Sequence, residues 1–329
     1  MQAFTYARVG TLAEAIAALQ QPHAQAVAGG TELLNWMKEG IAAPQRIIDI
    51  NNLAGLDRIE VDDHGLRIGA LARMSDVAAS AHVQSAYPAI AQALLASASP
   101  QIRNMATMGG NMMQRTRCRY FRADVDLPCN KRRPGSGCAA IAGDDRAAAI
   151  FGGSNQCIAT HPSDVAVALA ALDATVQIDG PGGKRSVPVA DFHRLPGDSP
   201  TQDTELERGE IITAIVVPPS AAARRSHYLK VRERASYEFA LVSAAVGVDL
   251  DGSRIRAVHI ALGGVAARPW RLKASEMALR GTLLSDETAL RGALDKDFDR
   301  AQPGRHNAFK IELAKRAVIR ALRMAGERA

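Results

Sequence analysis

Hydrophobic and polar positions in the first hundred residues alternate between short helical and short extended patterns. Leu12, Ile16 and Leu19 recur at the spacing of one helix face, and Thr11 and Glu14 form a capping box at its start. We therefore expect an amphipathic helix to begin at this point. The same criteria predict strands at 45–50, 58–61 and 66–71, and helices at 32–39, 75–80 and 88–97.

Residues 101–160 break this pattern, because they are rich in Gly, Asn, Arg, Cys and Pro and show no sustained period of 2 or 3.6. A segment of this length without regular structure inside a compact domain usually carries function. Regular structure is predicted to return with a helix at 163–172 and a hairpin whose strands, 175–178 and 185–189, flank Gly-Pro-Gly-Gly.

A strand at 211–217 ends at Pro218 and Pro219, where we place a domain boundary that gives domains of 1–219 and 220–329. The last predicted helix has an apolar stripe that is expected to pack on the strands before it, giving a smaller α+β domain. The elements predicted in this second domain are strands at 227–231, 240–250 and 255–262 and helices at 274–280, 286–293 and 307–324.

Composition places the chain among ordinary globular proteins. It has 329 residues, of which 47% are hydrophobic and 22% charged, which excludes wholesale disorder and predicts two domains. No apolar run is long enough for a transmembrane helix, and the N-terminal residues lack the pattern of a secretion signal, so we expect neither. Aromatic residues, at 4%, are too few for a surface that stacks single-stranded nucleic acid.

The net charge is +6, and most of it lies in one stretch, residues 115–133. Such a stretch attracts nucleic acid, anionic lipid or a phosphate-bearing cofactor, or else it is a solvated loop, and composition does not separate these interpretations. The stretch contains two acidic residues, Asp124 and Asp126, and seven basic ones: Arg115, Arg117, Arg119, Arg122, Lys131, Arg132 and Arg133.

All four cysteines lie within one 40-residue window, so they are treated as a set. Their spacing, C-x10-C-x8-C-x18-C, lacks the close pairs of a typical zinc site, and a chain of this length does not need disulfides to fold. Thiolates from a long irregular loop also hold iron–sulfur clusters. A cluster, a zinc ion, and disulfides or free thiols all remain open for Cys118, Cys129, Cys138 and Cys157.

Two double-glycine turns are candidate phosphate sites. In the first, Gly29 and Gly30 precede Thr31, which is expected to cap the helix at 32–39, and this helix start offers unpaired N–H groups to a pyrophosphate. In the second, Thr107 and Asn111 flank a further Gly-Gly pair as side-chain donors. Taken alone, the first turn is favoured to be a purely structural strand-to-helix bend, and the alternative interpretation of the second is a bulged loop.

Fingerprints of other chemistries are missing. The sequence contains no G-x-G-x-x-G, P-loop, G-x-S-x-G or H-E-x-x-H motif, so no catalytic acid, base or nucleophile is assigned. His161 has no nearby His partner in the sequence, and a capping or packing role is favoured over metal ligation. Four methionines are expected to fill gaps in the core: Met105, Met108, Met112 and Met113.

The chain resembles the FAD-binding subunits of molybdenum hydroxylases, the xanthine oxidase family, in AGGTELL at 28–34, ATMGGN at 106–111, HPSD at 161–164 and KVRERASYEFALVSAAV at 230–246. The resemblance spans essentially the whole chain. The cysteine-bearing insert at about 115–160 is similar to that of the flavin subunit of bacterial periplasmic aldehyde oxidoreductase, which carries a 4Fe-4S cluster. The flavin subunit of 4-hydroxybenzoyl-CoA reductase also has a cluster-bearing insert and is the alternative.

This resemblance implies an α+β fold in which a two-part FAD-binding domain of the vanillyl-alcohol-oxidase (PCMH) type precedes a small domain of the carbon monoxide dehydrogenase flavoprotein type. It implies that the two glycine turns hold the FAD pyrophosphate, that Asp164 contacts the flavin nucleotide, that Lys230 lies on a strand facing the flavin, and that the four cysteines ligate the cluster. The implied cofactor-binding residues are Ala26, Val27, Ala28, Gly29, Gly30, Thr31, Glu32, Leu33, Leu34, Thr107, Gly110, Asn111, Asp164 and Lys230.

The same resemblance implies an electron-transfer subunit of a heterotrimer. A large molybdopterin-binding subunit oxidises an aldehyde to a carboxylic acid, a small subunit with 2Fe-2S clusters passes the electrons to this FAD, and an external acceptor receives them. A xanthine dehydrogenase-like enzyme and a zinc-stabilised nucleic-acid-binding protein are further alternatives. We expect no nucleic-acid partner and no membrane insertion, and either periplasmic residence after export as a folded complex or a cytoplasmic location.

Overall fold

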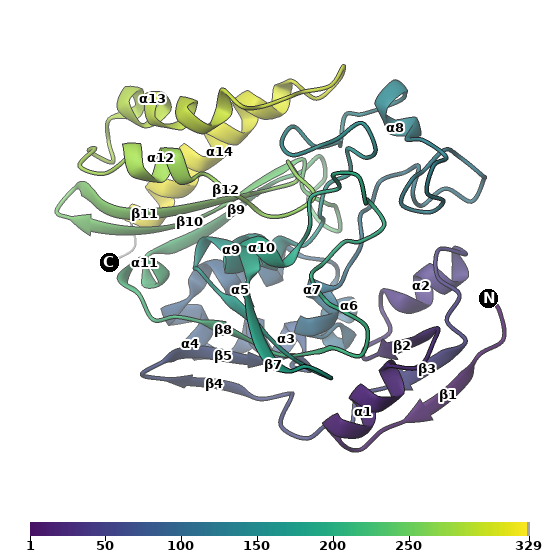
Figure 1. Ribbon diagram of the computed structural model, residues 1–329. Coiled ribbons are helices and arrows are strands. Elements are labelled where there is room, and N and C mark those ends of the chain that lie inside the picture. The colour runs from purple at the N-terminus through teal and green to yellow at the C-terminus, as the bar shows by residue number, and fades with distance from the viewer. Residues whose placement is uncertain (328–329) are drawn as a thin grey trace.

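The computed structural model describes residues 1–327, so the last two residues of the predicted 220–329 domain lie outside the described part. Three sheets and the helices that cover them form successive layers, with the N-terminal sheet at one end and the C-terminal sheet at the other (Figure 1). This mixed α and β content agrees with the predicted α+β class. Irregular loops of the insert occupy one side of the molecule, around the short helix α8 (Ala139–Ala142).

The first sheet is small and parallel, with strand order β1-β3-β2. The capping box at Thr11 and Glu14 is confirmed, but the predicted cap at Thr31 is wrong. Glu32 occupies the cap position instead and caps with no side-chain hydrogen bond, while Gly40 ends the helix at a φ of +67° as expected. The elements are β1 (Thr5–Arg8), α1 (Leu12–Leu19), β2 (Ala24–Val27), α2 (Leu33–Lys38) and β3 (Arg46–Asp49).

The second sheet is antiparallel and has the order β4-β5-β8-β6-β7. The strands predicted at 58–61 and 66–71 pair within it, and the predicted hairpin at 175–189 is confirmed. Its elements are β4 (Ile59–Asp62), β5 (Gly65–Gly69), β6 (Thr175–Gly180), β7 (Gly183–Pro188) and β8 (Ile211–Val217), and its helices are α3 (Met74–Ala79), α4 (Ala81–Ala86), α5 (Pro88–Ala96), α6 (Pro100–Met105), α7 (Met108–Met112), α9 (Asp164–Ala171) and α10 (Val189–Phe192).

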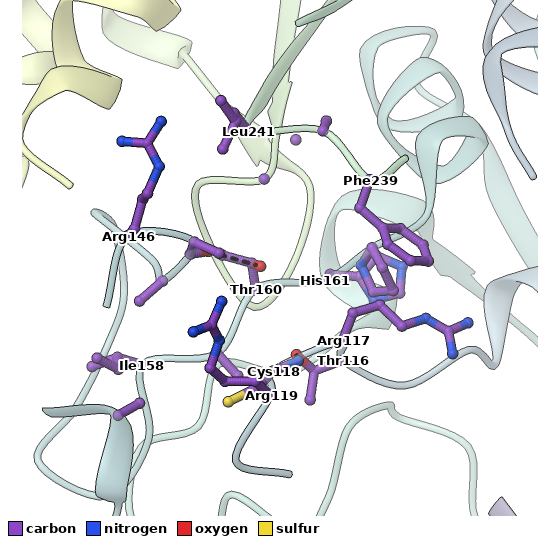
Figure 2. A pocket seen from close by; sticks show the side chains of 18 of the residues that line it. Thr116, Arg117, Cys118, Arg119, Arg146, Ile158, Thr160, His161, Phe239 and Leu241 are labelled. Carbon is purple, nitrogen blue, oxygen red and sulfur yellow. Dashed lines mark hydrogen bonds between the residues drawn. The ribbon is translucent and has the colours of Figure 1, made fainter. Parts of the chain in front are cut away.

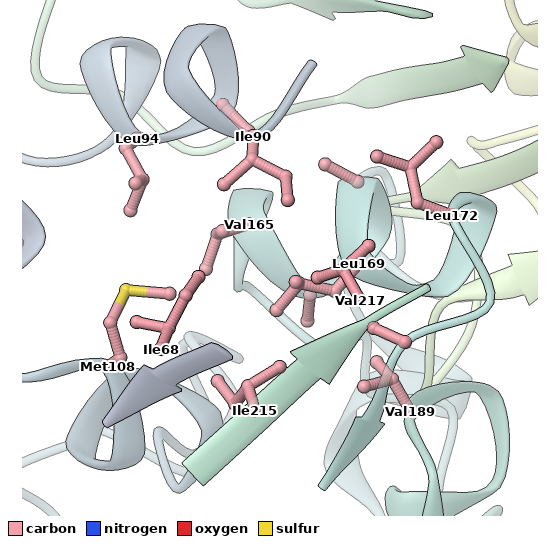
Figure 3. Close-up of a cluster of buried hydrophobic side chains, with 14 of the residues drawn as sticks. Ile68, Ile90, Leu94, Met108, Val165, Leu169, Leu172, Val189, Ile215 and Val217 are labelled. Carbon is pink, nitrogen blue, oxygen red and sulfur yellow. The ribbon is translucent and has the colours of Figure 1, made fainter. Parts of the chain in front are cut away.

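The main hydrophobic core lies between this sheet and its helices. Ile68 and Ile215 from the sheet converge with Ile90 of α5 and Leu169 of α9, and all four side chains are excluded from solvent (Figure 3). Met108 and Met112 also fill this core, as predicted. The prediction is wrong for Met105, whose side chain is 51% exposed, since it ends α6 with its backbone turned toward the first glycine turn.

The third sheet, of order β12-β11-β10-β9, carries α14 across its outer face, which confirms the predicted packing of the last helix on the strands. Its inner face rests on α5 and α9, so the two predicted domains share a packed boundary. The elements are α11 (Ala221–Arg224), β9 (Ser226–Val231), β10 (Val242–Asp251), β11 (Arg254–Gly263), β12 (Trp270–Arg271), α12 (Lys273–Ala278), α13 (Glu287–Phe298) and α14 (Phe309–Gly326).

Candidate functional site

The two glycine turns, far apart in sequence, meet at one cavity in the first predicted domain. A Cβ placed on Gly29 would overlap the carbonyl oxygen of Met105, so only glycine permits this approach. Gly109 packs less tightly against Ala70, whose carbonyl accepts a hydrogen bond from the Gly109 N–H at 2.8 Å. The Gly29–Met105 contact therefore holds the first turn against the end of α6, which leads directly into the second turn.

Side chains from neighbouring elements hold this arrangement. Asn51 donates through Nδ2 to the carbonyl of Ala28 at 3.1 Å, and Arg73 donates to the carbonyl of Met105. Thr107 caps α7 by accepting the N–H of Gly110 at 3.2 Å. These bonds leave the concave side of both turns open.

A cavity of about 440 Å³ lies between the two turns. It is bounded on its far side by the segment 206–210. Of the predicted cofactor-binding residues, Leu34 is absent from its wall and is 39% exposed, and Asn111, Asp164 and Lys230 lie elsewhere. The predicted residues that line it are Ala26, Val27, Ala28, Gly29, Gly30, Thr31, Glu32, Leu33, Thr107 and Gly110.

A second cavity, of about 250 Å³, adjoins the first and shares Thr31, Glu32 and Gly110 with it. Three more predicted residues line this second cavity: Asn111, Asp164 and Lys230. The structure thus brings every predicted cofactor-binding residue except Leu34 to the walls of two adjoining cavities.

Asp164 is held in a buried network. Its Oδ2 accepts Lys230 Nζ at 2.8 Å and Ser97 Oγ at 2.9 Å, and its Oδ1 accepts the hydroxyl of Tyr228. The side chains of Asp164 and Lys230 are buried, at 6% and 4% exposed, so each charge is neutralised by the other and not by water. Burial and the Asp164 charge raise the pKa of Tyr228, which therefore stays a donor.

The carboxylate of Glu32 bonds to residues at the start of the insert. Oε1 accepts Arg122 Nη2 at 2.8 Å and the backbone N–H of Arg115 at 3.2 Å, besides the indole N–H of Trp36, and Oε2 accepts Arg117 Nη2 at 2.6 Å. Four donors occupy this carboxylate, so the predicted role of Glu32 in cofactor binding is limited to its backbone and position. The side chain instead anchors the start of the insert to the first glycine turn.

A third cavity, of about 370 Å³, lies between the insert and the C-terminal sheet (Figure 2). Arg117, His161 and Phe239 lie together on one side of it, opposite Arg146, and Cys118 lies on its wall. It shares five residues with the second cavity: Arg117, Pro162, Asp164, Glu238 and Phe239. The three cavities therefore form one continuous series that runs from the glycine turns to the cysteine-bearing insert.

The four cysteines, spread over 40 positions, gather in this insert as free thiols. The backbones of Cys129 and Cys138 pair in an antiparallel bridge, and Cys118 interacts electrostatically with both. Cys157 interacts in the same way with Cys138 and Cys118. The predicted set is thus brought into one neighbourhood by four separate loop segments.

Burial acts on the protonation of two of these thiols, Cys118 and Cys157. It raises the pKa of Cys157 to about 11 and also raises that of Cys118, while the Lys131 charge acts on Cys157 in the opposite direction. In residues 1–327, the His, Cys, Asp and Glu side chains form no group of three or more that could hold a metal ion. Ligands of a single zinc ion converge to about 2.3 Å from one point, whereas ligands of a cluster are held apart by the cluster itself.

The basic stretch 115–133 does not present a patch of unpaired positive charge. Its buried side chains also do not belong to a solvated loop. Lys131 and Arg115 both pair with Asp203 at 2.6 Å, and the Lys131 side chain is only 5% exposed. Among the described residues, Arg132 is the one member of the stretch that pairs with no carboxylate, and it donates to the carbonyl of Ala123. The remaining pairs are Arg117–Glu32, Arg122–Glu32, Arg122–Glu39, Arg119–Asp144 and Arg133–Asp126.

His161 packs on His193 with ring centroids 3.9 Å apart, which confirms a packing role. Burial lowers the pKa of both imidazoles, that of His193 to about 4. Sequence reasoning missed His193, as it missed Tyr228 and Ser97 around Asp164, because their partners lie tens of residues away and no local spacing marks them.

Two family matches together cover most of the chain. Residues 2–220 match the family described as the FAD binding domain in molybdopterin dehydrogenase, and residues 227–325 match the CO dehydrogenase flavoprotein C-terminal domain. The predicted boundary at residue 219 stays a prediction. No helix of the described residues 1–327 has both the length and the apolar character needed to cross a membrane.

Individual proteins resemble the chain over nearly its full length. The aldehyde oxidoreductase FAD-binding subunit PaoB of Escherichia coli K12 is 49% identical over 325 residues, 98% of each chain. The glyceraldehyde dehydrogenase medium chain of Sulfolobus acidocaldarius is 30% identical and covers 86% of this chain and 83% of its own. A carbon monoxide dehydrogenase structure from Hydrogenophaga pseudoflava superposes with a TM-score of 0.76 at 28% identity, covering 100% of this chain and 99% of the other.

Proposed function

The chain belongs to the FAD-binding subunits of the molybdenum hydroxylase family, and from that premise we propose that it is the FAD- and 4Fe-4S-carrying subunit of an aldehyde oxidoreductase. It is an oxidoreductase subunit that binds FAD. The aldehyde substrate is proposed because a relative 49% identical is named for it. The single observation that carries the proposal is the continuous cavity series from the glycine turns to the cysteines.

FAD fits the first two cavities chemically. Gly29, Gly30 and Gly110 line the first cavity with backbone and no side chain, which leaves room for the oxygens of a pyrophosphate close to the main chain. Asp164 keeps one lone pair on Oδ1 for a nucleotide hydroxyl, since its other acceptor positions are occupied. FAD supplies the two-electron redox chemistry, and the chain binds and orients it.

A 4Fe-4S cluster fits the donor set of the insert. Four free thiols meet in one neighbourhood, and Lys131 places a buried positive charge beside Cys157 that favours the thiolate form. Cys118, Cys129, Cys138 and Cys157 would hold the cluster. The buried ion pairs of the basic stretch favour a role in tuning the potential of the cluster over a role in docking a partner subunit.

The proposed partners follow from the same assignment. A large molybdopterin subunit would oxidise the aldehyde to the carboxylic acid, and a small 2Fe-2S subunit would deliver two electrons to the FAD of this chain. An external acceptor would then receive them. We propose residence in the periplasm after export as a folded complex, with a cytoplasmic location as the alternative.

The remaining alternatives differ in substrate or class. A 4-hydroxybenzoyl-CoA reductase-like or xanthine dehydrogenase-like enzyme would use the same subunit architecture with another large subunit. A zinc-stabilised nucleic-acid-binding protein is disfavoured, because six of the seven basic side chains in the stretch 115–133 are engaged with carboxylates within the chain.

The test is to purify the chain together with the subunits encoded beside it, extract the cofactors and assay substrates. We expect one FAD and four irons per chain in addition to the iron of the small subunit, and reduction of an artificial acceptor by aldehydes. A colourless complex without extractable flavin would contradict the whole proposal. Flavin with no iron beyond the small subunit would contradict the cluster, and turnover of purines but not of aldehydes would move the assignment to the alternative.

A further inference from the structure

Arg117 carries a buried polar atom that no protein group satisfies. Among the described residues, its Nε is one of four buried side-chain nitrogens or oxygens without a hydrogen-bond partner, and His161 Nε2 is another. Both residues line the third cavity. A buried donor without a partner is destabilising, so two such atoms on residues of one cavity wall indicate that a bound group supplies the missing partners.

The rest of the Arg117 side chain is firmly held. Its Nη2 donates to Glu32 at 2.6 Å, and its guanidinium lies 5.1 Å from the ring centre of Phe239. Burial lowers its pKa and the Glu32 charge opposes that shift, so the side chain remains a cation at neutral pH. A cation with a fixed orientation is a preorganised donor.

Arg117 lies where the second cavity meets the third cavity, which reaches the cysteine-bearing insert. It is one of the five residues shared by the second and third cavities, and Cys118 is its neighbour in the chain. It belongs to the insert and not to either glycine turn, so no cofactor motif of the sequence includes it.

We propose that Arg117 is a flavin-contacting residue supplied by the insert, with its Nε–H donating to an acceptor atom of the isoalloxazine ring. His161 Nε2 lies on the same wall and offers a second polar contact to that ring edge. This inference rests on the proposed function. It gives the insert a second task beside holding the cysteines.

The chemistry explains why a cation belongs there. Addition of an electron pair increases the negative charge on the pyrimidine side of a flavin, and a fixed guanidinium in a cavity shielded from water stabilises that charge. Arg117 therefore stabilises the reduced ring more than the oxidised ring. Its loss lowers the flavin midpoint potential as well as the affinity for FAD.

The test uses the complete complex with Arg117→Met, Arg117→Lys and the control Arg119→Met. Arg119 lines the same cavity, but its side chain is 71% exposed and pairs with Asp144. FAD is removed and titrated back, the flavin midpoint potential is measured by spectroelectrochemistry, and iron per chain is determined. We expect Arg117→Met to weaken FAD binding at least about tenfold, the loss of one charged hydrogen bond, and to lower the midpoint potential.

Arg117→Lys retains the charge for Glu32 and lacks the Nε–H, so we expect partial recovery of the potential and little recovery of FAD affinity. If Arg117→Met and Arg119→Met both keep wild-type affinity and potential, the inference is overturned and Arg117 only anchors the loop. If Arg117→Met does not assemble, Arg117→Lys decides alone: wild-type affinity and potential in that variant overturn the inference. Wild-type complex that takes up no FAD contradicts the proposed function itself.

Discussion

Asp164 and Lys230 form a buried ion pair, with Nζ 2.8 Å from Oδ2, across the boundary between α9 and β9. The family resemblance predicts that Asp164 contacts the flavin nucleotide and that Lys230 lies on a strand facing the flavin, and in the structure each is also the electrostatic partner of the other. Lys230 also donates to the carbonyl of Ala96 at 3.1 Å. The pair fixes the C-terminal sheet against the helices of the first domain beside the second cavity.

Lys230→Met leaves the buried Asp164 carboxylate without its cation, with only the neutral donors Ser97 and Tyr228. We expect the free energy of unfolding to fall by about 3 kcal/mol, measured by urea denaturation, and Asp164→Asn in the same chain to restore part of it. Arg316→Met is the control, because its pair with Glu312 is exposed and is expected to contribute less than about 1 kcal/mol. Equal losses in the two single variants would contradict a structural role for the buried pair.

Gly29→Ala tests the contact between the two glycine turns. The added Cβ would overlap the carbonyl of Met105, which is backbone and cannot rotate away, so the turns must separate. We expect loss of bound flavin, measured by the absorbance of the purified complex, and destabilisation of about 1–3 kcal/mol. Gly182→Ala is the matched control, since a Cβ there meets nothing within 4 Å. Full flavin content in Gly29→Ala would show that the close approach is not required.

Glu32→Gln tests the anchor between the first glycine turn and the insert. Glutamine keeps an acceptor for Trp36 but removes the charge that holds Arg117 and Arg122, so the start of the insert should loosen. We expect faster limited proteolysis within 115–135 and a stability loss of about 1.5–3 kcal/mol. Glu39→Gln removes only the outer partner of Arg122 and should change the cleavage rate little. Identical cleavage of both variants would argue against the anchor.

Local patterns were enough to predict most of the regular structure. The capping box at Thr11, the hairpin around Gly183 and the amphipathic helix α14 are each specified within a few turns of chain, and each is present. The strand at Thr5–Arg8 was missed because all four of its residues are exposed, so it shows no alternation. Thr31 was a plausible cap by residue type, but the helix begins one position later, where Glu32 is held by the insert.

The sequence predicts which residue types form the site, but it does not predict which of these residues bond to one another. Glycine pairs and clustered cysteines are visible in the sequence because the chemistry they serve requires those residue types. The bond between Glu32 and Arg117 joins positions 85 residues apart, and that between Asp164 and Ser97 joins positions 67 apart. Such pairs are set by the packing of whole elements, so a single sequence without related sequences carries no signal for them.

His193 predicts how the stability of the chain depends on pH. Burial lowers its pKa to about 4, and its Nε2 bonds to the carbonyl of Met112 at 2.9 Å, so the folded protein holds the imidazole neutral. Below about pH 6.5 the His193 imidazole takes up a proton in the unfolded chain but not in the folded chain. The contribution of His193 to stability is therefore complete above pH 6.5 and is lost as the pH falls toward 4. The lowering of the His161 pKa acts in the same direction.

We expect the free energy of unfolding to fall by up to about 3 kcal/mol between pH 6.5 and 4 through His193 alone, at about 1.4 kcal/mol per pH unit. His193→Gln should flatten this part of the profile, whereas the exposed His82→Gln should leave it unchanged. A wild-type slope in His193→Gln would assign the acid sensitivity to other groups.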